Sequence, residues 1–316
     1  MVSPILKWAG GKRQLLDELY ARFPKEYERY HEPMFGGGAL FFELEPNDGT
    51  INDRNPRLIN FYRQVQSHPE KLIRLLQDED FFRDPEADPD PSQEFSETNR
   101  KGKEISNFYY QQRELFNRRP NGEKMDELKE AARLLYLNRT CFNGLYRENQ
   151  SGEFNVPIGR YSNPDWVRSE EIRAASRALK GTEIYNVDFR DVLNVKYARV
   201  EAGDLVYFDP PYEPMSRTAN FTDYSAEGFS KEDQDDLLEL ASSLRSRDIH
   251  VILSNSGVMY EMYEEAGFHV ETEGATRSIN SDAENRDEVD EIIATTIAPD
   301  ERQEAGQLQI ENFGQD

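Results

Sequence analysis

The chain has 316 residues and a formal net charge of −23, from 38 Lys and Arg against 61 Asp and Glu. No run approaches the roughly 18 apolar residues of a membrane-spanning helix, and the N-terminal residues lack the basic and apolar regions of a signal peptide. The single cysteine, Cys141, excludes an internal disulfide and a cysteine-based metal site, and the four histidines have no metal-ligand spacing. We therefore expect a cytoplasmic, monomeric protein without a metal and without a membrane contact.

The charge also carries information about the partner. The basic residues are 27 Arg and 11 Lys, and an acid-rich, Lys-poor composition is typical of halophilic proteins. We therefore expect a halophilic archaeon as the source. Residues 100–177 hold 15 basic against 11 acidic residues. A locally basic segment in an acidic protein indicates where a phosphate backbone would lie.

The first third of the chain contains residues typical of turns between its expected helices and strands. A glycine-rich turn at 34–39 precedes an apolar helical stretch at 40–44, and a strand is expected at 49–53. Pro56 fits the first turn of the helix that follows. Residues 83–103 are acidic, rich in proline and almost free of apolar side chains, which predicts a flexible surface insertion.

The rest of the chain changes pattern once. Two helices, at 104–118 and 126–138, lead to an expected hairpin at 142–161 with its turn at Asn149–Gly152. After it, helices at 169–179, 231–246 and 258–266 alternate with strands at 183–187, 204–209, 250–255, 268–273 and 291–296. Such alternation predicts a mostly parallel α/β sheet with helices on both faces. The middle third interrupts it and is interpreted as an inserted recognition region.

The sequence Asp209-Pro210-Pro211-Tyr212 directly follows the apolar run 204–208. In an open α/β sheet, ligands bind beyond the carboxyl ends of the strands. A nucleobase amine is a weak nucleophile because its lone pair is delocalised into the ring. An Asp carboxylate and a Pro carbonyl can accept its two N–H groups and free the lone pair, while a Tyr ring stacks on the base. The alternative is a proline-rich turn that caps a buried strand.

Three further stretches suit a nucleoside ligand. Trp8-Ala-Gly-Gly-Lys12 combines an indole, glycines that allow close approach, and an ammonium group, although an ordinary turn is the alternative. Gly36–Gly38 precedes a helix as in nucleotide-binding turns, without the full dinucleotide or P-loop pattern. Asp53 ends the next strand, where an acid can bind ribose hydroxyls or cap a helix.

Asp188 and Phe189 follow the strand expected at 183–187. The carboxylate can accept a hydrogen bond from an adenine amino group, and the Phe ring can pack on the base. The alternative is a helix N-cap followed by a core phenylalanine.

Taken in order, these residues resemble the Dam-type DNA adenine-N6 methyltransferases of the D12 class. The matching segments are Lys7–Lys12, Glu32–Ala39, Ile51–Asp53, Asn143–Arg147, Gly152–Tyr161, Asp188-Phe189, Asp209–Tyr212 and Arg277 with Arg286 and Val289–Ile292. The resemblance implies a Rossmann-like S-adenosylmethionine-dependent methyltransferase sheet formed by 1–60 and 180–298. It also implies a mainly helical target-recognition region at 61–179 that carries the hairpin, and a flexible tail at 299–316.

The resemblance implies residue roles as well. S-adenosylmethionine would be held by residues from several turns, namely Trp8, Lys12, Met34, Phe35, Gly36, Gly38, Asp53, Asp188, Phe189 and Asp209. The family usually has Phe where Met34 stands, so either Met34 or Phe35 would cover the cofactor adenine. Asp209 and Pro210 would bind the target amine, and Tyr212 would stack on an adenine flipped out of the duplex. Methyl transfer would be a direct displacement that depends on positioning.

The expected hairpin resembles the family's target-recognition hairpin, in which an aromatic side chain wedges into the duplex and an Arg reads a guanine edge. The residues implied to contact DNA are Arg139, Phe142, Asn143, Leu145, Arg147, Pro157, Arg160 and Tyr161. Arg139 and Arg160 fit phosphate contacts better than base contacts. The resemblance favours GATC as the recognition site, and the alternative is a hairpin whose Arg touches only phosphate.

The tail carries a separate pattern. Gln307, Ile310 and Phe313 have the spacing of the peptide that binds the PCNA sliding clamp, although Gly314 stands where a final aromatic residue is usual. The alternative is a solvated tail.

The sequence thus favours a site-specific methyltransferase that acts on N6 of adenine in duplex DNA by base flipping. One alternative is an N4-cytosine or RNA-base amine methyltransferase, because the same residues would serve any exocyclic amine. Another is a non-catalytic DNA-binding protein that retains the fold. Duplex DNA is the expected partner, with a cognate restriction endonuclease as a further candidate.

Overall fold

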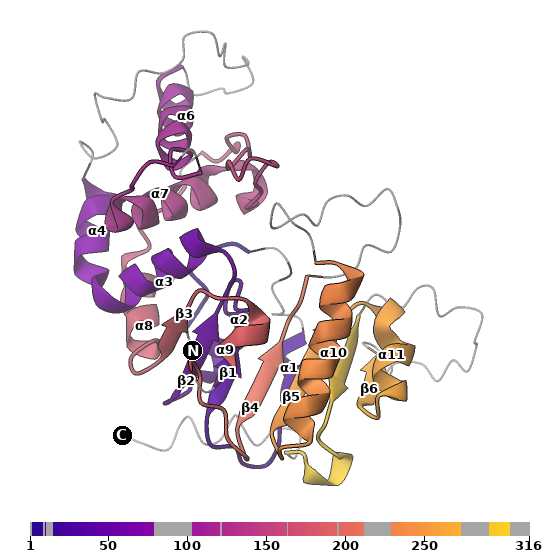
Figure 1. Ribbon diagram of the computed structural model, residues 1–316. Coiled ribbons are helices and arrows are strands. Elements are labelled where there is room, and N and C mark those ends of the chain that lie inside the picture. The colour runs from indigo at the N-terminus through magenta and orange to yellow at the C-terminus, as the bar shows by residue number, and fades with distance from the viewer. Residues whose placement is uncertain are drawn as a thin grey trace.

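The computed structural model describes residues 2–8, 10, 15–78, 103–120, 122–162, 164–194, 196–211, 229–272 and 291–303 (Figure 1). Several predicted features lie outside these residues: Lys12, Tyr212, residues 83–102 of the acidic insertion, and the clamp-like residues Gln307, Ile310 and Phe313.

The centre of the fold is a seven-stranded sheet in the order β3-β2-β1-β4-β5-β7-β6. Its strands are β1 (Tyr30–Glu32), β2 (Gly49–Asn52), β3 (Glu183–Tyr185), β4 (Leu205–Phe208), β5 (His250–Asn255), β6 (His269–Thr272) and β7 (Ile292–Thr295). The strands β1 to β5 are parallel to one another, whereas β7 runs antiparallel to β5 and to β6. The predicted mostly parallel α/β sheet is confirmed, and it is consistent with a methyltransferase fold.

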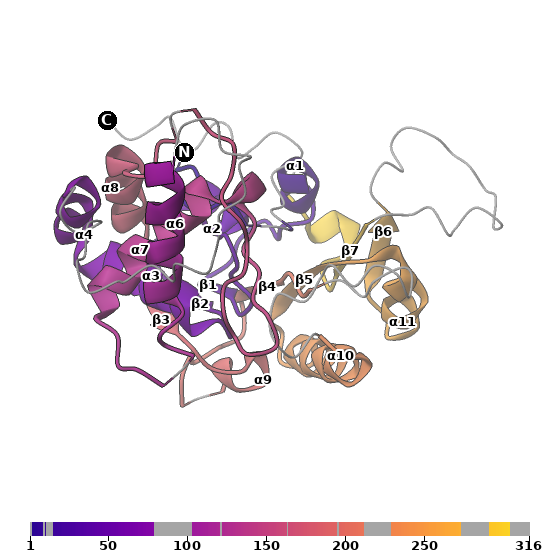
Figure 2. The same cartoon turned by 90° about the horizontal axis from the view of Figure 1, so that it is seen from above.

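The helices cover both faces of this sheet. They are α1 (Leu16–Tyr20), α2 (Ala39–Leu44), α3 (Pro56–Ser67), α4 (Pro69–Gln77), α6 (Lys103–Phe116), α7 (Glu127–Thr140), α8 (Ser169–Ala178), α9 (Phe189–Val192), α10 (Lys231–Arg245) and α11 (Tyr260–Glu265). Seen from above, α9 and α10 lie on one side of the strands and α1 on the other (Figure 2). The predicted helices are confirmed to within a few residues at each end.

Successive side chains of β4 enter two different cores. Leu205 and Tyr207 pack into one core, whereas Val206 and Phe208 pack into the other with residues of α9, α10 and α11. A central parallel strand is buried on both faces, which explains why residues 205–208 are apolar without alternation. This burial fixes where β4 ends and therefore where the residues that follow it emerge.

The strand β1 and the helices α1 and α4 were not predicted. β1 has only three residues, Tyr-His-Glu, and only the first is apolar, so it shows no period of its own. It is nevertheless buried along its length, because it pairs with β2 on one side and β4 on the other. Tertiary packing, and not local propensity, makes this segment a strand.

The middle third forms a helical region beside the sheet (Figure 1). Its centre is α7, which packs against α3, α4 and α6. The predicted boundary after residue 60 falls inside α3, and this helix packs on α7 of the helical region as well as on β3 of the sheet. A shared helix of this kind joins the two parts of the chain.

The expected hairpin at 142–161 is not a pair of regular strands. The turn at Asn149–Gly152 is present, but the two arms are joined only by the isolated bridges Cys141↔Ile158 and Glu148↔Phe154. The side chain of Asn117 ties the second arm to the end of α6, because it accepts from the Phe154 amide at 2.8 Å and donates to the Phe154 carbonyl at 2.9 Å.

A buried His–Asp hydrogen bond ties β1 to the start of β4. His31 and Asp204 are almost fully buried, and their Nε2 and Oδ2 atoms lie 3.1 Å apart. The Asp204 carboxylate also accepts from the Arg29 and Glu201 amides at 3.2 and 2.8 Å. Burial disfavours the carboxylate, but these hydrogen bonds prevail and lower the pKa of Asp204.

A lowered pKa stabilises the folded state only while Asp204 is ionised. We expect the free energy of unfolding to fall as the pH drops below about 4, the ordinary pKa of an aspartic acid. Asp204→Asn should lower it by about 2 kcal/mol at pH 7 and remove this part of the acid dependence. Urea unfolding between pH 7 and pH 3 measures both, with the exposed Asp235→Asn as control. An Asp204→Asn protein as stable as wild type at pH 7 would contradict the assignment.

Candidate active site and known relatives

The predicted ligand-binding residues converge at the carboxyl edge of the parallel strands. The chain leaves β1 into the glycine turn, β2 into Asp53, β3 into Asp188, and β4 into Asp209. The strand order reverses between β1 and β4, which neighbour each other but lead to opposite halves of the sheet. Crevices at such reversal points are the usual ligand sites of open α/β sheets.

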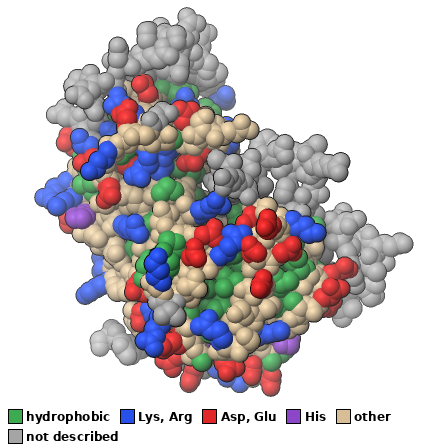
Figure 3. Space-filling view, in the orientation of Figure 1, with side chains coloured by type: hydrophobic (Ala, Val, Ile, Leu, Met, Phe, Trp, Pro, Cys, Tyr) green, Lys and Arg blue, Asp and Glu red, His purple; other side chains and the backbone are tan. Residues whose placement is uncertain are grey.

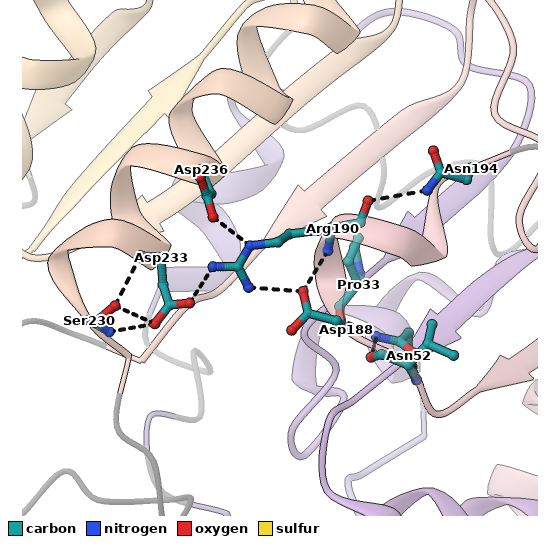
Figure 4. A network of polar contacts seen from close by, with 9 residues as sticks. Pro33, Asn52, Asp188, Arg190, Asn194, Ser230, Asp233 and Asp236 are labelled. Carbon is teal, nitrogen blue, oxygen red and sulfur yellow. Dashed lines mark hydrogen bonds and ion pairs between the residues drawn. The ribbon is translucent and has the colours of Figure 1, made fainter.

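Asn52, at the end of β2, holds three of these connections together. Its side chain is 1% exposed. The Nδ2 group donates to the carbonyls of Pro33 and Val187 at 2.9 and 3.0 Å, and Oδ1 accepts from the Val187 amide at 3.0 Å (Figure 4). One amide thus fixes the turns after β1 and β3 relative to β2. The sequence analysis quoted Asn52 within a matching segment but gave it no role.

Asp53 fixes the glycine turn and is not a helix cap. Its Oδ2 accepts from the Gly36 amide at 2.9 Å, and its Oδ1 accepts from the Asn55 amide at 2.8 Å. The N-cap of α3 is Asn55, whose side chain accepts from two amides of the first turn. Burial raises the pKa of Asp53, although the two amide hydrogen bonds oppose this effect.

The glycine turn needs its glycines because two aromatic rings press against it. A Cβ atom on Gly38 would lie 2.3 Å from the Phe35 ring, and one on Gly37 would lie 2.9 Å from Cβ of Trp8. Gly36 and Gly38 also have positive φ angles of 50° and 67°. The turn therefore presents its backbone closely to whatever binds above it.

Phe35 and Met34 differ in their surroundings. The Phe35 ring is 2% exposed and packs edge-on against Tyr62, with the ring centroids 4.8 Å apart. Met34 is only half-buried and packs on the other core. The Phe35 side chain therefore supports the turn from inside, and Met34 is the better candidate for contact with a ligand.

Trp8 connects the turn to the middle third of the chain. Its indole stacks on the ring of Tyr146, with centroids 4.9 Å apart and an interplanar angle of 26°. The Tyr146 hydroxyl donates to Glu148, which lies 3.6 Å from the guanidinium of Arg57 at the start of α3. This stack joins the predicted cofactor residue Trp8 to the predicted recognition loop.

Asp188 and Phe189 begin α9 beside the same edge. Asp188 is the N-cap and accepts from the Arg190 amide at 3.0 Å. The Arg190 guanidinium donates to Asp188 at 3.0 Å and also binds Asp233 and Asp236 of α10 (Figure 4). Both features named as the alternative, a cap and a buried Phe, are present. They place these two side chains against α10 and leave a ligand role untested.

Asp209 follows β4 at the reversal point, and Pro210 after it is buried. Its Oδ1 accepts from the Ser254 hydroxyl at 3.2 Å. Glu32, at the end of β1, is a neighbouring acid that the sequence analysis did not single out. Burial raises the pKa of Glu32 well above its ordinary value, and the charges of Asp209 and Asp53 raise it further, although a hydrogen bond from Tyr30 opposes them. Glu32 therefore holds its proton more readily than an ordinary glutamic acid.

The predicted recognition residues lie on and beside an irregular loop, and their exposure is unusual. Phe142, Leu145 and Tyr161 are 46%, 39% and 37% exposed, and they are three of the four large apolar residues that are exposed among the described residues. Clustered exposed apolar side chains mark interaction sites. Among the other predicted contacts, the structure leaves four exposed: Asn143, Arg147, Pro157 and Arg160.

Two basic residues at this loop already make hydrogen bonds within the protein. The Arg147 Nε donates to Asn155 at 2.7 Å, and the half-buried Arg139 donates to the Asp165 carbonyl at 3.3 Å. Lys7, which the sequence analysis did not assign, donates to the Tyr161 hydroxyl at 3.1 Å and lies over the Tyr161 ring. It adds a positive charge next to the exposed aromatic residues.

Within the described part of the chain, no group of His, Cys, Asp and Glu side chains is arranged to hold a metal. In the same residues, no helix is both long and apolar enough to cross a bilayer.

Comparison with known proteins assigns the chain to a family. The model of the D12 class N6 adenine-specific DNA methyltransferases matches residues 8–279. The chain belongs to this family. It is a site-specific DNA adenine methyltransferase, which sets aside the non-catalytic and cytosine- or RNA-directed alternatives.

Three of its relatives match over nearly their whole length. It is 40% identical over 298 residues to the type II methyltransferase M1.LlaDCHI of Lactococcus lactis subsp. cremoris, which covers 93% of this chain and 95% of the relative. It is 37% identical to the type II methyltransferase M.MjaIII of Methanocaldococcus jannaschii, over 90% of this chain and 95% of the relative. It is 36% identical to the DNA adenine methylase of Escherichia coli K12, over 92% of this chain and 93% of the relative.

The role of Asn52 in this methyltransferase can be tested by substitution. Asn52→Leu keeps a similar volume but leaves the Pro33 and Val187 groups without partners. We expect it to lower the free energy of unfolding by about 2–4 kcal/mol and to abolish methylation of DNA, since the turns lose their fixed positions.

The matched control is Asn194→Leu. Asn194 is exposed, and its amide makes a single 3.5 Å bond to the Arg190 carbonyl (Figure 4). This variant should unfold and methylate like wild type. Full activity of Asn52→Leu in the same assays would show that the strand-end turns do not need this amide.

Proposed function

We propose that this methyltransferase transfers a methyl group from S-adenosylmethionine to N6 of adenine at GATC, on a base flipped out of duplex DNA. The observation that carries the proposal is the position of Asp209. Its carboxylate emerges from β4 at the reversal point of the sheet, beside the glycine turn, with Pro210 directly after it. A flipped base is required because N6 cannot be reached inside a stacked duplex.

The strand-end turns fit S-adenosylmethionine. The turn at Gly36–Gly38 has no room for side chains, so its backbone can approach a ligand closely. Asp53, at the end of β2, has the place of an acid that binds ribose hydroxyls, and Met34 and Asp188 flank the same edge. When bound, this cofactor supplies an electrophilic methyl group on a sulfonium.

The protein's own groups would prepare the nucleophile. Asp209 and the Pro210 carbonyl accept the two N–H groups of the target amine, which localises the nitrogen lone pair toward the methyl donor. The transfer would break the S–C bond of the donor as the N–C bond forms. Positive charge would develop on the nitrogen, and the Asp209 carboxylate would stabilise it electrostatically until the nitrogen loses its extra proton. Tyr212, outside the described residues, is proposed to stack on the base.

The exposed loop supports duplex recognition. Phe142 can wedge between base pairs, and Arg147 can donate two hydrogen bonds to a guanine edge. Arg139 and Arg160 are assigned to phosphates. The helical region shows basic side chains mixed with acidic ones, whereas acidic side chains gather along the opposite, lower edge of the molecule (Figure 3). Phosphates would therefore meet less repulsion at the helical region than at that lower edge.

The wider role is proposed from the sequence and the relatives. Two relatives are named type II methyltransferases, which supports the proposal that a cognate restriction endonuclease accompanies this enzyme. Contact of Gln307, Ile310 and Phe313 with a sliding clamp remains a prediction from their spacing.

The chemistry is tested by Asp209→Ala. We expect the rate of methyl incorporation into a duplex with one GATC site to fall about a thousandfold, because the developing charge loses its stabilising partner. Thermal unfolding should be close to that of wild type, since the change also removes a charge next to Glu32 and Asp53. The exposed Asp235→Asn serves as control. Undiminished turnover by Asp209→Ala would refute the assigned role.

The recognition site is tested with Arg147→Ala and Arg160→Ala as a pair. The preference is that for GATC over a duplex in which the guanine is replaced. Loss of a guanine contact should reduce this preference about 10- to 100-fold. Loss of a phosphate contact should weaken binding to both duplexes equally. Competition between the two duplexes, at fixed salt, measures the preference. An unchanged preference in Arg147→Ala would assign that side chain to phosphate.

A further inference from the structure

Two buried hydroxyl groups form a line behind Asp209. The hydroxyls of Tyr207 and Ser254 lie 2.8 Å apart, and the Ser254 hydroxyl lies 3.2 Å from Asp209 Oδ1. Tyr207 is 1% exposed and Ser254 is 0% exposed. The line therefore runs from the interior of the sheet to the residue that is proposed to receive the target amine.

The register of two parallel strands creates this line. β4 pairs with β5 through Tyr207↔Ile252 and Phe208↔Leu253, so the next position on each strand brings Asp209 opposite Ser254. The central pair of the sheet thus sets the distance between Ser254 and Asp209, which directly follows β4. A serine at a fully buried strand position costs free energy unless its hydroxyl is hydrogen-bonded. Here both of its neighbours in the line are polar.

The chemistry of the groups fixes the direction of the hydrogen bonds. An ionised carboxylate can only accept, so the Ser254 hydroxyl donates its one hydrogen to Asp209. It must then accept from Tyr207, whose hydroxyl is the donor. Tyr207 keeps its proton, because burial and the charge of Asp209 raise its pKa well above the ordinary value.

We propose that Ser254 is a positioning residue for methyl transfer. Its hydroxyl, oriented by Tyr207, donates a hydrogen bond to Oδ1 of Asp209. This bond holds the carboxylate in the orientation that receives the target amine. The proposal rests on the role assigned to Asp209 above. It adds a requirement that the strand-end sequence alone does not contain, namely a donor from the neighbouring strand β5.

The surroundings of Asp209 make such a donor valuable. The titratable groups near this line include Glu32 at the end of β1, Glu291 before β7 and Tyr30, in addition to Tyr207 itself. A hydrogen bond to a carboxylate favours its charged form. Without Ser254, Asp209 would take up a proton more readily, and a protonated Asp209 cannot stabilise positive charge on the amine.

The test compares Ser254→Ala with Ser254→Thr, which keeps a hydroxyl. Ser254→Ala is expected to lower kcat about 10- to 100-fold, the effect of one hydrogen bond to a charged group, and to change KM for DNA less than threefold. The acid limb of the pH profile of kcat should move to higher pH. Ser254→Thr should recover most of kcat and the wild-type limb. Tyr207→Phe should have a smaller effect in the same direction, because Ser254 still has a hydrogen to donate.

Thr295→Val is the matched control for removal of a buried hydroxyl. Thr295 of β7 is also fully buried and donates to the Val251 carbonyl at 3.0 Å, but it does not contact Asp209. This variant should lose stability without moving the acid limb. If Ser254→Ala behaves like Thr295→Val, with its limb unmoved and no recovery in Ser254→Thr, the hydroxyl is structural and the inference is wrong. If Asp209→Ala itself remains active, the proposed function fails first, so the two failures are distinguishable.

Discussion

The structure depends on one constraint: parallel strands that end side by side bring their next residues to one edge, and a single buried amide keeps the turns there in place. Asn52 satisfies three backbone groups from the turns after β1 and β3. Those turns carry the glycine backbone and Asp188, and Asp53 directly follows the amide. Because backbone groups are fixed in this way, a ligand would meet a preformed surface, which reduces the ordering cost of binding.

Electrostatics impose a second condition on this edge. Glu32, Asp53 and Asp209 crowd three carboxyl groups around the reversal point. Burial raises the pKa of Glu32, amide hydrogen bonds hold Asp53, and the hydroxyl line from Tyr207 through Ser254 reaches Asp209. Each of the three carboxyl groups is thus stabilised in a different way. The arrangement leaves the negative charge on Asp209, where it can stabilise a developing ammonium. The side chains involved lie on or directly after four different strands.

Much of this could be predicted from the sequence. The apolar run 204–208 and the strand–helix alternation gave the sheet, and Asp209, Asp53 and the glycine turn were found because each follows a strand with a recognisable pattern. Glu32 and Ser254 were missed for the opposite reason. β1 is too short to show a period, and a serine in a buried strand resembles any small core residue until the register places it opposite Asp209. The hairpin was predicted as strands from the alternation after its turn, but the arms pair only at two isolated bridges.

The central claim is that Asp209 receives the target amine with Ser254 on its Oδ1. A crystal structure with the cofactor analogue sinefungin and a GATC duplex tests it most directly. The account predicts an adenine outside the helix, its N6 about 3 Å from Asp209 and from the Pro210 carbonyl, with the Ser254 bond retained. An adenine still stacked in the duplex, or an extrahelical base whose amine faces other groups, would contradict it.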